Sequence, residues 1–273
     1  MTFVVAEVGI NHNGSLDLAK KIIDAARWAG ADAVKFQKRT VATIYAKDMN
    51  KPRESPWGDT VAAQKYGLEF NRSQYDEIDR YCKSIKMPWF ASAWDEYALE
   101  FLESYDLPYN KIASAMVTNI PFVRAVAKEG KPIFMSTAMC DGQMIEMARA
   151  QINGPLTLMH CVGMYPCPEH LLNLRCIETL RKTFGLPVGY SGHEASVSPS
   201  VVAVVLGAVA VERHITTDRT MYGSDQPASL EPHGFKQLVD TIRKVPNVMG
   251  DGVKKLTEQE KDVAKKLRYW EAT

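Results

Sequence analysis

Short runs of apolar residues alternate along this chain with longer segments in which apolar residues recur at helical spacing. We interpret the apolar runs as buried strands and the periodic segments as helices. The predicted strands cover residues 3–8, 32–37, 88–93, 109–114, 132–137, 156–161, 187–191 and 208–213. The predicted helices cover residues 16–29, 72–86, 95–104, 119–129, 141–151, 172–184, 196–206 and 233–246.

This order of elements predicts an α/β protein with a single domain, a (β/α)₈ TIM barrel. Repeated right-handed crossovers between parallel strands close a sheet of this kind. A doubly wound open sheet is the rival fold, but the chain has no glycine-rich dinucleotide fingerprint. We assign residues 1–250 to the barrel and residues 251–273 to a C-terminal helical tail, in which Thr257 and Glu260 form the capping pattern of one helix over 257–273.

Two connections are longer than a plain loop between a strand and a helix. They cover residues 38–71 and 215–232, after the second and the last predicted strand. Both leave the carboxyl end of a strand, where a barrel builds its active site. We therefore expect both connections to contribute to a functional site.

Polar side chains stand at or just after the end of every predicted strand. Because the carboxyl ends of barrel strands meet on one face, we expect these side chains to line one pocket. They are Glu7, Lys35, Gln37, Ser92, Lys111, Ser114, Ser136, His160, Ser191, His193, Glu212 and His214. The lysines and serines predict a cradle for an anion, since ammonium and hydroxyl groups donate hydrogen bonds to phosphate and carboxylate oxygens.

Two histidines follow neighbouring strands of the predicted barrel. His193 comes after the seventh strand and His214 after the eighth, so their imidazoles are expected side by side. Two such histidines could hold a divalent metal and leave a position open for substrate or water. A pair of hydrogen-bonded surface histidines is the alternative, and position alone does not separate the two interpretations.

Composition excludes several classes of protein. The chain has 273 residues, of which 46% are hydrophobic and 24% charged, with a formal net charge of +1. This balance argues against a nucleic-acid partner, and the sequence has no apolar run long enough to span a membrane. The N-terminal residues lack the pattern of a signal peptide, and the five cysteines are scattered, which predicts reduced thiols in a cytoplasmic enzyme rather than a zinc cluster.

Two other functions fit a barrel with this ring of polar residues. In a class I aldolase, Lys35 or Lys111 would form a Schiff base with a carbonyl substrate. Alternatively, the chain would be an inactive barrel kept as a binding or assembly subunit. That second function predicts the loss of site residues, and the complete ring argues against it.

Several motifs, taken together and in this order, resemble the phosphoenolpyruvate-dependent N-acetylneuraminate (sialic acid) synthases. They are "AEVGINHNGSLDLAKKIIDAARWAGADAVKFQ" (6–37), "KIAS" (111–114), "KPIFMSTAM" (131–139), "MHCVGMYPCP" (159–168), "GLPVGYSGHE" (185–194), "ERHITTDR" (212–219) and "GSDQPASLEP" (223–232). The resemblance implies a (β/α)₈ barrel that condenses phosphoenolpyruvate with an open-chain N-acetylhexosamine and releases phosphate. It also implies a homodimer.

The same resemblance implies a role for each matching residue. His193 and His214 would hold a divalent metal, typically Mn²⁺, with Mg²⁺ or Co²⁺ as alternatives. The positions of Lys35, Ser92 and Lys111 match contacts to the carboxylate and nearby phosphate of phosphoenolpyruvate. The matching phosphate contacts are Ser114, Ser136 and Ser191, and the matching sugar contacts are Gln37, Tyr165 and Asp225. The residues assigned to catalysis are Glu7, which would move a proton or stabilise a cation, Lys35, Lys111 and Glu212, which would orient the site beside a metal ligand.

The remaining histidines of the motifs receive structural assignments. His12 and Asn11 belong to the "NHNG" signature, for which we expect a structural role in the loop at least as much as a substrate contact. We expect His160 to be a packed residue behind the site. His170 and His233 are expected on the surface.

The chain departs from the family pattern at several positions. Gly192 stands where many members have aspartate, and Gly163 where an asparagine is common. Ala115 and Met116 replace a glycine and an acid that meets the sugar. The antifreeze-like domain that usually follows the barrel, with its arginine over the acetamido group, is not in the sequence.

These departures concern the acceptor sugar. In place of the absent arginine, Arg39 and Arg53 in the 38–71 connection are available as a cap. The sequence therefore predicts an acceptor that differs from N-acetylmannosamine. A 3-deoxy-ulosonate synthase acting on a shorter or non-acetylated aldose is the alternative.

Overall fold

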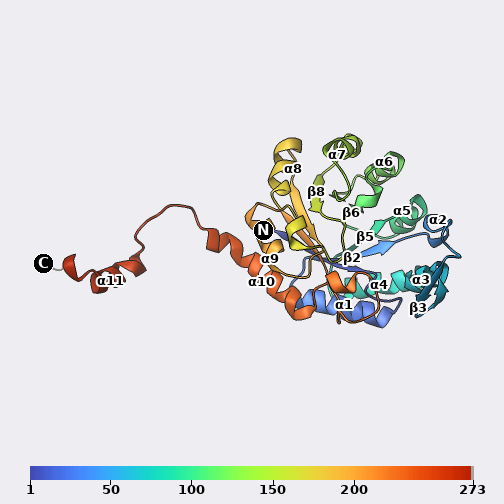
Figure 1. Cartoon of the computed structure of the whole chain (residues 1–273), viewed down its shortest axis with the longest axis horizontal. Helices are drawn as coiled ribbons and strands as arrows, with labels where there is room; N and C mark the ends of the chain where they lie inside the picture. Colours follow the sequence, from blue (N-terminus) through green and yellow to red (C-terminus); the bar gives the residue numbers. More distant parts are fainter. Residues whose placement is uncertain (272–273) are drawn as a thin grey trace.

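The computed structural model describes residues 1–271 and shows a closed barrel of parallel strands (Figure 1). The order of strands around the barrel is β1-β10-β9-β8-β7-β6-β5-β2, so barrel strands that follow one another in the sequence are neighbours in space. The barrel strands are β1 (Phe3–Gly9), β2 (Ala33–Lys38), β5 (Trp89–Ala93), β6 (Asn110–Ile112), β7 (Ile133–Ser136), β8 (Leu156–Cys161), β9 (Val188–Gly192) and β10 (Ala210–His214). The predicted (β/α)₈ barrel is confirmed, and the open-sheet rival is wrong.

A helix follows each barrel strand on the outside. The helices are α1 (Leu16–Ala29), α4 (Arg72–Ser84), α5 (Glu96–Glu103), α6 (Ile120–Lys128), α7 (Gly142–Arg149), α8 (Cys176–Phe184), α9 (Ser198–Val205) and α10 (Pro232–Met249). Polar residues just before five of them, Ser15, Asn71, Asp95, Asn119 and Asp141, accept a backbone N–H of the first turn. These caps explain why several predicted helix starts agree with the structure to within one residue.

Several predicted boundaries need correction. The helix predicted from 172 begins at Cys176, because Asn173 has a left-handed backbone with φ of 43°. The strand predicted over 109–114 ends at Ile112, and short 3₁₀ turns lie at Ser114–Met116, Glu169–Leu171 and Gln226–Ala228.

The tail leaves the barrel after α10 and runs away from it (Figure 1). It contains α11 (Glu258–Leu267) and a 3₁₀ turn at Tyr269–Glu271. Thr257 and Glu260 form the predicted capping box. The helix is shorter than the predicted 257–273 and buries no residue, so no packing extends it; positions 272–273 lie outside the described residues.

The interior of the barrel is layered. An aromatic floor of Phe3, Phe90, Tyr109 and Phe134 packs with ring centroids 5.3–6.0 Å apart. Two residues after Phe90, Tyr109 and Phe134, the side chain that faces the same way is polar: Ser92, Lys111 and Ser136, respectively. Since side chains alternate along a strand, residues two positions apart face the same side, and these polar groups form a layer directly above the aromatic floor.

The 38–71 connection is folded rather than irregular. It forms α2 (Val41–Ile44), the antiparallel pair β3 (Pro52–Ser55) and β4 (Gly58–Thr60), and α3 (Val61–Leu68). A side chain at Gly67 would lie 2.1 Å from the Trp57 ring, and Gln64 Nε2 donates to the Tyr222 hydroxyl at 2.6 Å. These contacts fix α3 against the 215–232 connection over the mouth of the barrel.

None of the helices between residues 1 and 271 combines the length and the apolar character needed to cross a membrane.

Gly189 provides a test of the interior packing. A side chain there would lie 2.5 Å from Met159 Sδ and 2.7 Å from the Ala210 carbonyl oxygen in a neighbouring strand. We predict that Gly189→Ala lowers the free energy of unfolding by about 1–3 kcal/mol, as overpacking does. Gly154→Ala is the control, since nothing lies within 4 Å of its added Cβ.

Thermal unfolding of both variants measures the difference. Gly189→Ala should lower Tm by several degrees, at roughly 2–4 °C for each kcal/mol, and Gly154→Ala should leave it unchanged or slightly raised. Equal Tm values for the two variants would show that the barrel interior is not packed as described.

Candidate active site

The carboxyl ends of the barrel strands surround a cavity of about 170 Å³, which we call the inner chamber. The residues of the predicted ring that line it are Glu7, Lys35, Gln37, Ser92, Lys111, Ser114, Ser136, Ser191, His193, Glu212 and His214. Tyr165 lines it as well. His160 does not: it faces away from the chamber, where its Nε2 lies 2.8 Å from the Leu172 carbonyl oxygen. The expectation of one shared pocket therefore holds for every predicted residue of the ring except His160.

Four buried charges cross the inner chamber as a chain of ion pairs. Lys111 Nζ lies 2.9 Å from Glu212 Oε2, and Glu212 Oε1 lies 3.6 Å from Lys35 Nζ. Lys35 Nζ lies 2.7 Å from Glu7 Oε2. The four residues are between 1% and 6% exposed. Because isolated buried charges are strongly unfavourable, each of these charges needs its neighbours to remain ionised.

The pKa values of these ion-paired residues follow from the same contacts. Burial alone would lower the pKa of Lys35, but the charges of Glu212 and Glu7 outweigh burial and raise that pKa. Burial would raise the pKa of Glu212, but Lys111 and Lys35 outweigh it and lower that pKa to about 2. Lys35 is therefore an ammonium donor and Glu212 a carboxylate at neutral pH.

The serines complete the wall of the inner chamber. Lys35 Nζ donates to Ser92 Oγ at 3.4 Å, and Ser191 Oγ donates to Glu212 Oε1 at 3.3 Å. Ser114 Oγ accepts from the Ala138 backbone N–H at 3.0 Å and lies 3.3 Å from Cys161 Sγ. Sequence reasoning missed Cys161, although its inward position two residues after Met159 on β8 could have identified it.

His193 and His214 lie side by side, as predicted, with ring centroids 5.6 Å apart. His193 Nδ1 lies 2.8 Å from the Val162 carbonyl oxygen. Because a carbonyl oxygen only accepts, Nδ1 carries the proton in the neutral imidazole and Nε2 has its lone pair free. His214 Nδ1 is buried without a hydrogen-bond partner, 3.7 Å from Asp225 Oδ2. Burial, and then the nearby His214, lowers the pKa of His193 to about 3, so this imidazole is neutral.

These observations fit a divalent metal held by the two histidines. Neutral imidazoles are the form that binds a metal, and an orphaned buried nitrogen needs a partner. Within residues 1–271, no group of three or more His, Cys, Asp or Glu side chains is arranged to hold a metal. A metal bound by these two histidines would take its other ligands from water or substrate.

A buried network behind β9 and β10 supports the histidines. Arg213 is fully buried on the outer side of β10 and pairs with Glu194 at 2.8 Å. The Glu194 carboxylate also accepts from the Tyr190 hydroxyl at 2.7 Å and from Ser200 Oγ at 3.3 Å. Strand alternation explains why Arg213 faces outward while Glu212 and His214 face the chamber. The network fixes the loop that carries His193.

The other histidines behave as structural or surface residues. His12 stacks on Phe70 with ring centroids 3.9 Å apart, and burial lowers its pKa to about 3. Asn11 Nδ2 donates to the Ile215 carbonyl at 2.9 Å, which joins the loops after β1 and β10. His170 and His233 are exposed. These placements agree with the roles expected from the sequence.

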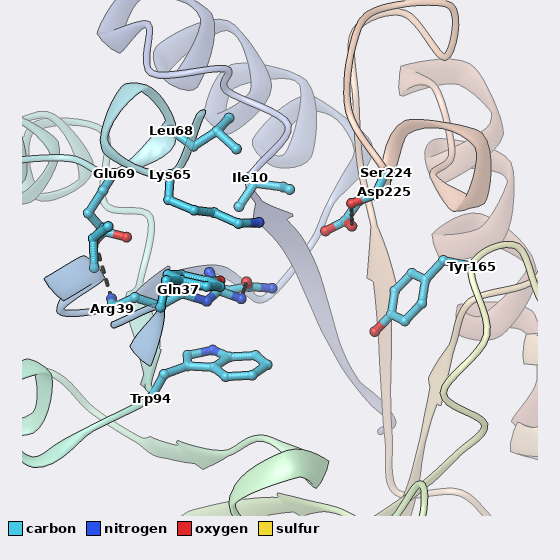
Figure 2. A pocket seen from close by; sticks show the side chains of 12 residues that line it. Ile10, Gln37, Arg39, Lys65, Leu68, Glu69, Trp94, Tyr165, Ser224 and Asp225 are labelled. Atoms are coloured by element: carbon cyan, nitrogen blue, oxygen red, sulfur yellow. Dashed lines mark hydrogen bonds between the residues drawn. The ribbon is translucent and has the colours of Figure 1, made fainter. Parts of the chain in front are cut away.

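A second cavity of about 280 Å³, which we call the outer chamber, is shown in Figure 2. Gln37, Trp94 and Tyr165 line both chambers. Predicted Asp225 lies only in the outer one. Five further lining residues were not predicted from the sequence: Tyr45, Lys65, Glu69, Trp94 and Ser224. Most of them lie in or beside the two long connections, 38–71 and 215–232.

The positions at which the chain departs from the family pattern, and the two candidate arginines, lie in different surroundings. A Cβ at Gly192 would lie 2.6 Å from Glu194 Oε2, so the buried network leaves no room for an aspartate there. A Cβ at Gly163 would meet only ordinary contacts, the nearest at 3.6 Å. Ala115 lines the inner chamber, whereas Met116 packs against the core. Arg39 lines the outer chamber, and Arg53 is exposed and outside its lining.

A closed parallel barrel with an ion-paired polar ring at the carboxyl ends of its strands defines a (β/α)₈-barrel enzyme class with a site for anionic substrates. The model of the NeuB family matches residues 22–254. The chain belongs to the NeuB family. It is an enzyme of the sialic acid synthase type, a transferase class that forms a carbon–carbon bond from phosphoenolpyruvate and an aldose.

Individual relatives support this assignment. Human N-acetylneuraminate-9-phosphate synthase is 39% identical and matches 97% of this chain and 76% of its own length. The N,N'-diacetyllegionaminic acid synthase of Legionella pneumophila is 34% identical over 94% of this chain and 76% of its own. A crystal structure of N-acetylneuraminic acid synthetase from Leptospira borgpetersenii, in complex with citrate, has a TM-score of 0.83 at 29% identity and covers 98% of this chain and 93% of that one.

The buried network generates a stability prediction. Arg213→Met would leave the Glu194 carboxylate buried without its cation, and we expect a loss of about 3–5 kcal/mol in the free energy of unfolding. The double variant Arg213→Met, Glu194→Gln removes both charges and should recover part of that loss. Urea unfolding measures both variants. A loss below about 1 kcal/mol for Arg213→Met would contradict the role of the pair.

Proposed function

We propose that this enzyme catalyses a metal-dependent condensation of phosphoenolpyruvate with an aldose, giving a 2-keto-3-deoxy sugar acid and phosphate. The observation that carries the proposal is the joining of two chambers of different chemistry. The inner one presents two lysines and four serines, which suit a small, highly charged anion. The outer one is larger, is lined by Gln37, Tyr165 and Asp225, and has room for a sugar.

Phosphoenolpyruvate would bind in the inner chamber. Lys35, Ser92 and Lys111 would bind its carboxylate and neighbouring phosphate, and Ser114, Ser136 and Ser191 would bind its phosphate. Glu7 and Glu212 hold the lysine ammonium groups in place before the ligand arrives, which reduces the reorganisation needed on binding. In this pose C3 of phosphoenolpyruvate faces the junction with the outer chamber.

The reaction forms one carbon–carbon bond and breaks one carbon–oxygen bond. The enol electrons of phosphoenolpyruvate attack the aldehyde carbon through C3, which leaves C2 cationic. Water adds to C2, and phosphate leaves with the bridging oxygen. The water oxygen becomes the ketone oxygen, and its two protons go to the former aldehyde oxygen and to the departing phosphate.

Glu7 is the residue best placed to assist this chemistry. Its carboxylate is 1% exposed, accepts from Gln37 Nε2 at 2.7 Å and pairs with Lys35. A fixed carboxylate at the junction of the chambers would stabilise the cation at C2 or take a proton from the water. Glu212 would act indirectly, by holding both lysines beside the metal ligand His214.

His193 and His214 would hold the divalent metal, Mn²⁺ being the first candidate and Mg²⁺ or Co²⁺ the alternatives. When bound, it would supply Lewis-acid polarisation of the sugar aldehyde. Tyr165, whose ring centroid lies 4.0 Å from that of His193, and Asp225 would position the sugar beside this pair.

The acceptor is proposed as an N-acetylmannosamine-like hexose or a variant of it, giving a nonulosonate. The names of the relatives support a nonulosonate but differ in the sugar: N-acetylneuraminate 9-phosphate in one and diacetyllegionaminic acid in another. A shorter or non-acetylated aldose is the alternative acceptor. We also propose a cytoplasmic homodimer, for which the family resemblance is the support.

A Schiff-base aldolase agrees less well with the geometry. Its nucleophile must be an uncharged amine, which requires a lowered lysine pKa. Lys35 lies between two carboxylates that raise its pKa, and Lys111 lies 2.9 Å from one of them. Borohydride trapping with substrate should therefore give no covalent adduct.

Consumption of phosphoenolpyruvate tests the proposal. Its ultraviolet absorbance should fall when the enzyme and Mn²⁺ meet the correct member of a panel of aldoses with four to six carbons, with and without N-acetyl groups. Lys111→Met should lower kcat/KM by at least about 100-fold, because it removes a fixed charge from the anion site. Lys128→Met, an exposed lysine on α6, is the control. Consumption unchanged in Lys111→Met, or a trapped lysine adduct, would contradict the proposal.

Metal removal tests the role of the two histidines. Chelation should abolish activity, and Mn²⁺ should restore it. His193→Ala and His214→Ala should each lose bound metal after gel filtration, measured by mass spectrometry, while the exposed His170→Ala retains it. Full activity of the chelated enzyme, or metal retained by both site variants, would refute the assignment.

A further inference from the structure

A third cavity, of about 520 Å³, is lined by residues of α7, of α8 and of the loops after β7 and β8. We call it the flank cavity. Its wall is shared in part with the inner chamber, through Ala138, Met139, Cys161 and Gly163. Besides Cys161, two further cysteines line the flank cavity, Cys140 and Cys176. The flank cavity therefore brings thiols to the wall of the inner chamber.

Two of these thiols contact the same serine of the inner chamber. Cys161 Sγ lies 3.3 Å from Ser114 Oγ, and Cys140 Sγ lies 4.0 Å from the Ser114 carbonyl oxygen. Ser114 Oγ accepts the Ala138 backbone N–H, so its own hydrogen is available to Cys161 Sγ. A hydrogen bond donated to sulfur favours the thiolate, which is the form that reacts with an oxidant.

The surroundings of the two thiols give them different roles in an oxidation. Cys161 faces the inner chamber, so a small polar oxidant that enters the chamber meets its sulfur. Burial, and then the nearby Cys161, raises the pKa of Cys140. Cys140 therefore remains a thiol until a reactive sulfur forms beside it. This order makes Cys161 the thiol that is oxidised first and Cys140 the thiol that resolves the product.

The loop after β7 has room to bring the two sulfurs together. Met139 is 70% exposed and has a left-handed backbone, with φ of 58°. Nothing lies within 4 Å of a Cβ added at Gly142, on the other side of Cys140. A disulfide requires its two Cα atoms within about 7 Å of each other. The flank cavity supplies the space in which Cys140 can turn toward Cys161.

We propose that Cys161 and Cys140 form a reversible disulfide when the enzyme meets hydrogen peroxide, and that this bond closes the anion site of the inner chamber. The Cys161 sulfur attacks a peroxide oxygen: an S–O bond forms, the O–O bond breaks and one water leaves. The Cys140 sulfur then attacks the sulfenic sulfur: an S–S bond forms, the S–O bond breaks and a second water leaves. The two thiols supply the two electrons and two protons, and a dithiol reverses the change by exchange.

The disulfide would disturb two parts of the inner chamber. Ser114, which is proposed to bind phosphate, would lose its sulfur partner. Cys161 is followed by Val162, whose carbonyl oxygen lies 2.8 Å from His193 Nδ1. A shift of Cys161 toward Cys140 would therefore also reach a proposed metal ligand. The effect on catalysis rests on the function proposed above, whereas formation of the disulfide does not.

Peroxide treatment followed by mass spectrometry tests the inference. The enzyme is treated with hydrogen peroxide, catalase removes the excess, free thiols are alkylated and unreduced peptides are analysed. We expect peptides linked through Cys140 and Cys161, and a fall in phosphoenolpyruvate consumption of at least about 10-fold, because a phosphate contact is lost. Dithiothreitol should remove the link and restore activity. Bound phosphoenolpyruvate should slow the oxidation, since its phosphate would occupy Ser114.

Cysteine variants separate the roles of the thiols. Cys161→Ser should resist peroxide and retain most of its own untreated activity. Cys140→Ser should still be oxidised at Cys161, but without a resolving thiol continued peroxide gives sulfinic acid, and dithiothreitol no longer restores activity. Cys176→Ser is the matched control: this thiol lines the same cavity, and its loss should leave the response of the wild type unchanged.

The outcomes distinguish this inference from the proposed function. Absence of a link between Cys140 and Cys161, or an equal loss of activity in Cys161→Ser, would overturn the inference while the condensation stands. A link that leaves activity unchanged would overturn the claim that the bond closes the site. If the link forms but the reduced enzyme consumes no phosphoenolpyruvate with any aldose, the disulfide stands and the proposed function fails.

Discussion

The site depends on the chain of buried charges from Lys111 through Glu212 and Lys35 to Glu7. These residues come from β6, β10, β2 and β1, so the chain of ion pairs exists only when the barrel closes. Removal of one member would leave its neighbour buried without a compensating charge. The aromatic floor lies beneath this layer, and strand alternation places each charged group above an apolar one. Barrel closure and formation of the anion site are thus the same structural event.

The same polar chain continues into the outer chamber. Glu7 accepts from Gln37, and Gln37 accepts from Arg39, which stacks on Trp94. A ligand that engages Arg39 would therefore contact the end of a hydrogen-bonded row that begins at the reacting centre. In the proposed function, this row joins the two substrates: the inner chamber binds phosphoenolpyruvate, and the outer chamber binds the acceptor.

Sequence periodicity was sufficient for the barrel and for most of the inner chamber. Each apolar strand carries its own inward and outward positions, so residues such as Lys35, Ser92 and Glu212 could be assigned from their place at the strand ends. His160 lies behind the ring, as expected for a packed residue, because the pocket-facing residue of β8 is Cys161, one position later, and a one-residue shift reverses the direction of a strand side chain.

Features that depend on tertiary packing could not be predicted from the sequence. The 38–71 connection packs through Trp57 on Tyr222 of the 215–232 connection, a contact between segments distant in sequence, so Lys65 gave no local signal of its position. The Glu194–Arg213 pair joins residues nineteen positions apart in sequence. Predicted helix ends differ from the observed ones where the backbone conformation of a single residue decides the boundary, as at Asn173.

A crystal structure with bound phosphoenolpyruvate would test the central claim most directly. The account predicts the ligand in the inner chamber, with its phosphate and carboxylate on Lys35, Lys111 and the serines, and with C3 directed toward the outer chamber. Phosphoenolpyruvate bound instead on Arg39 and Lys65 would contradict the division of the site into two chambers.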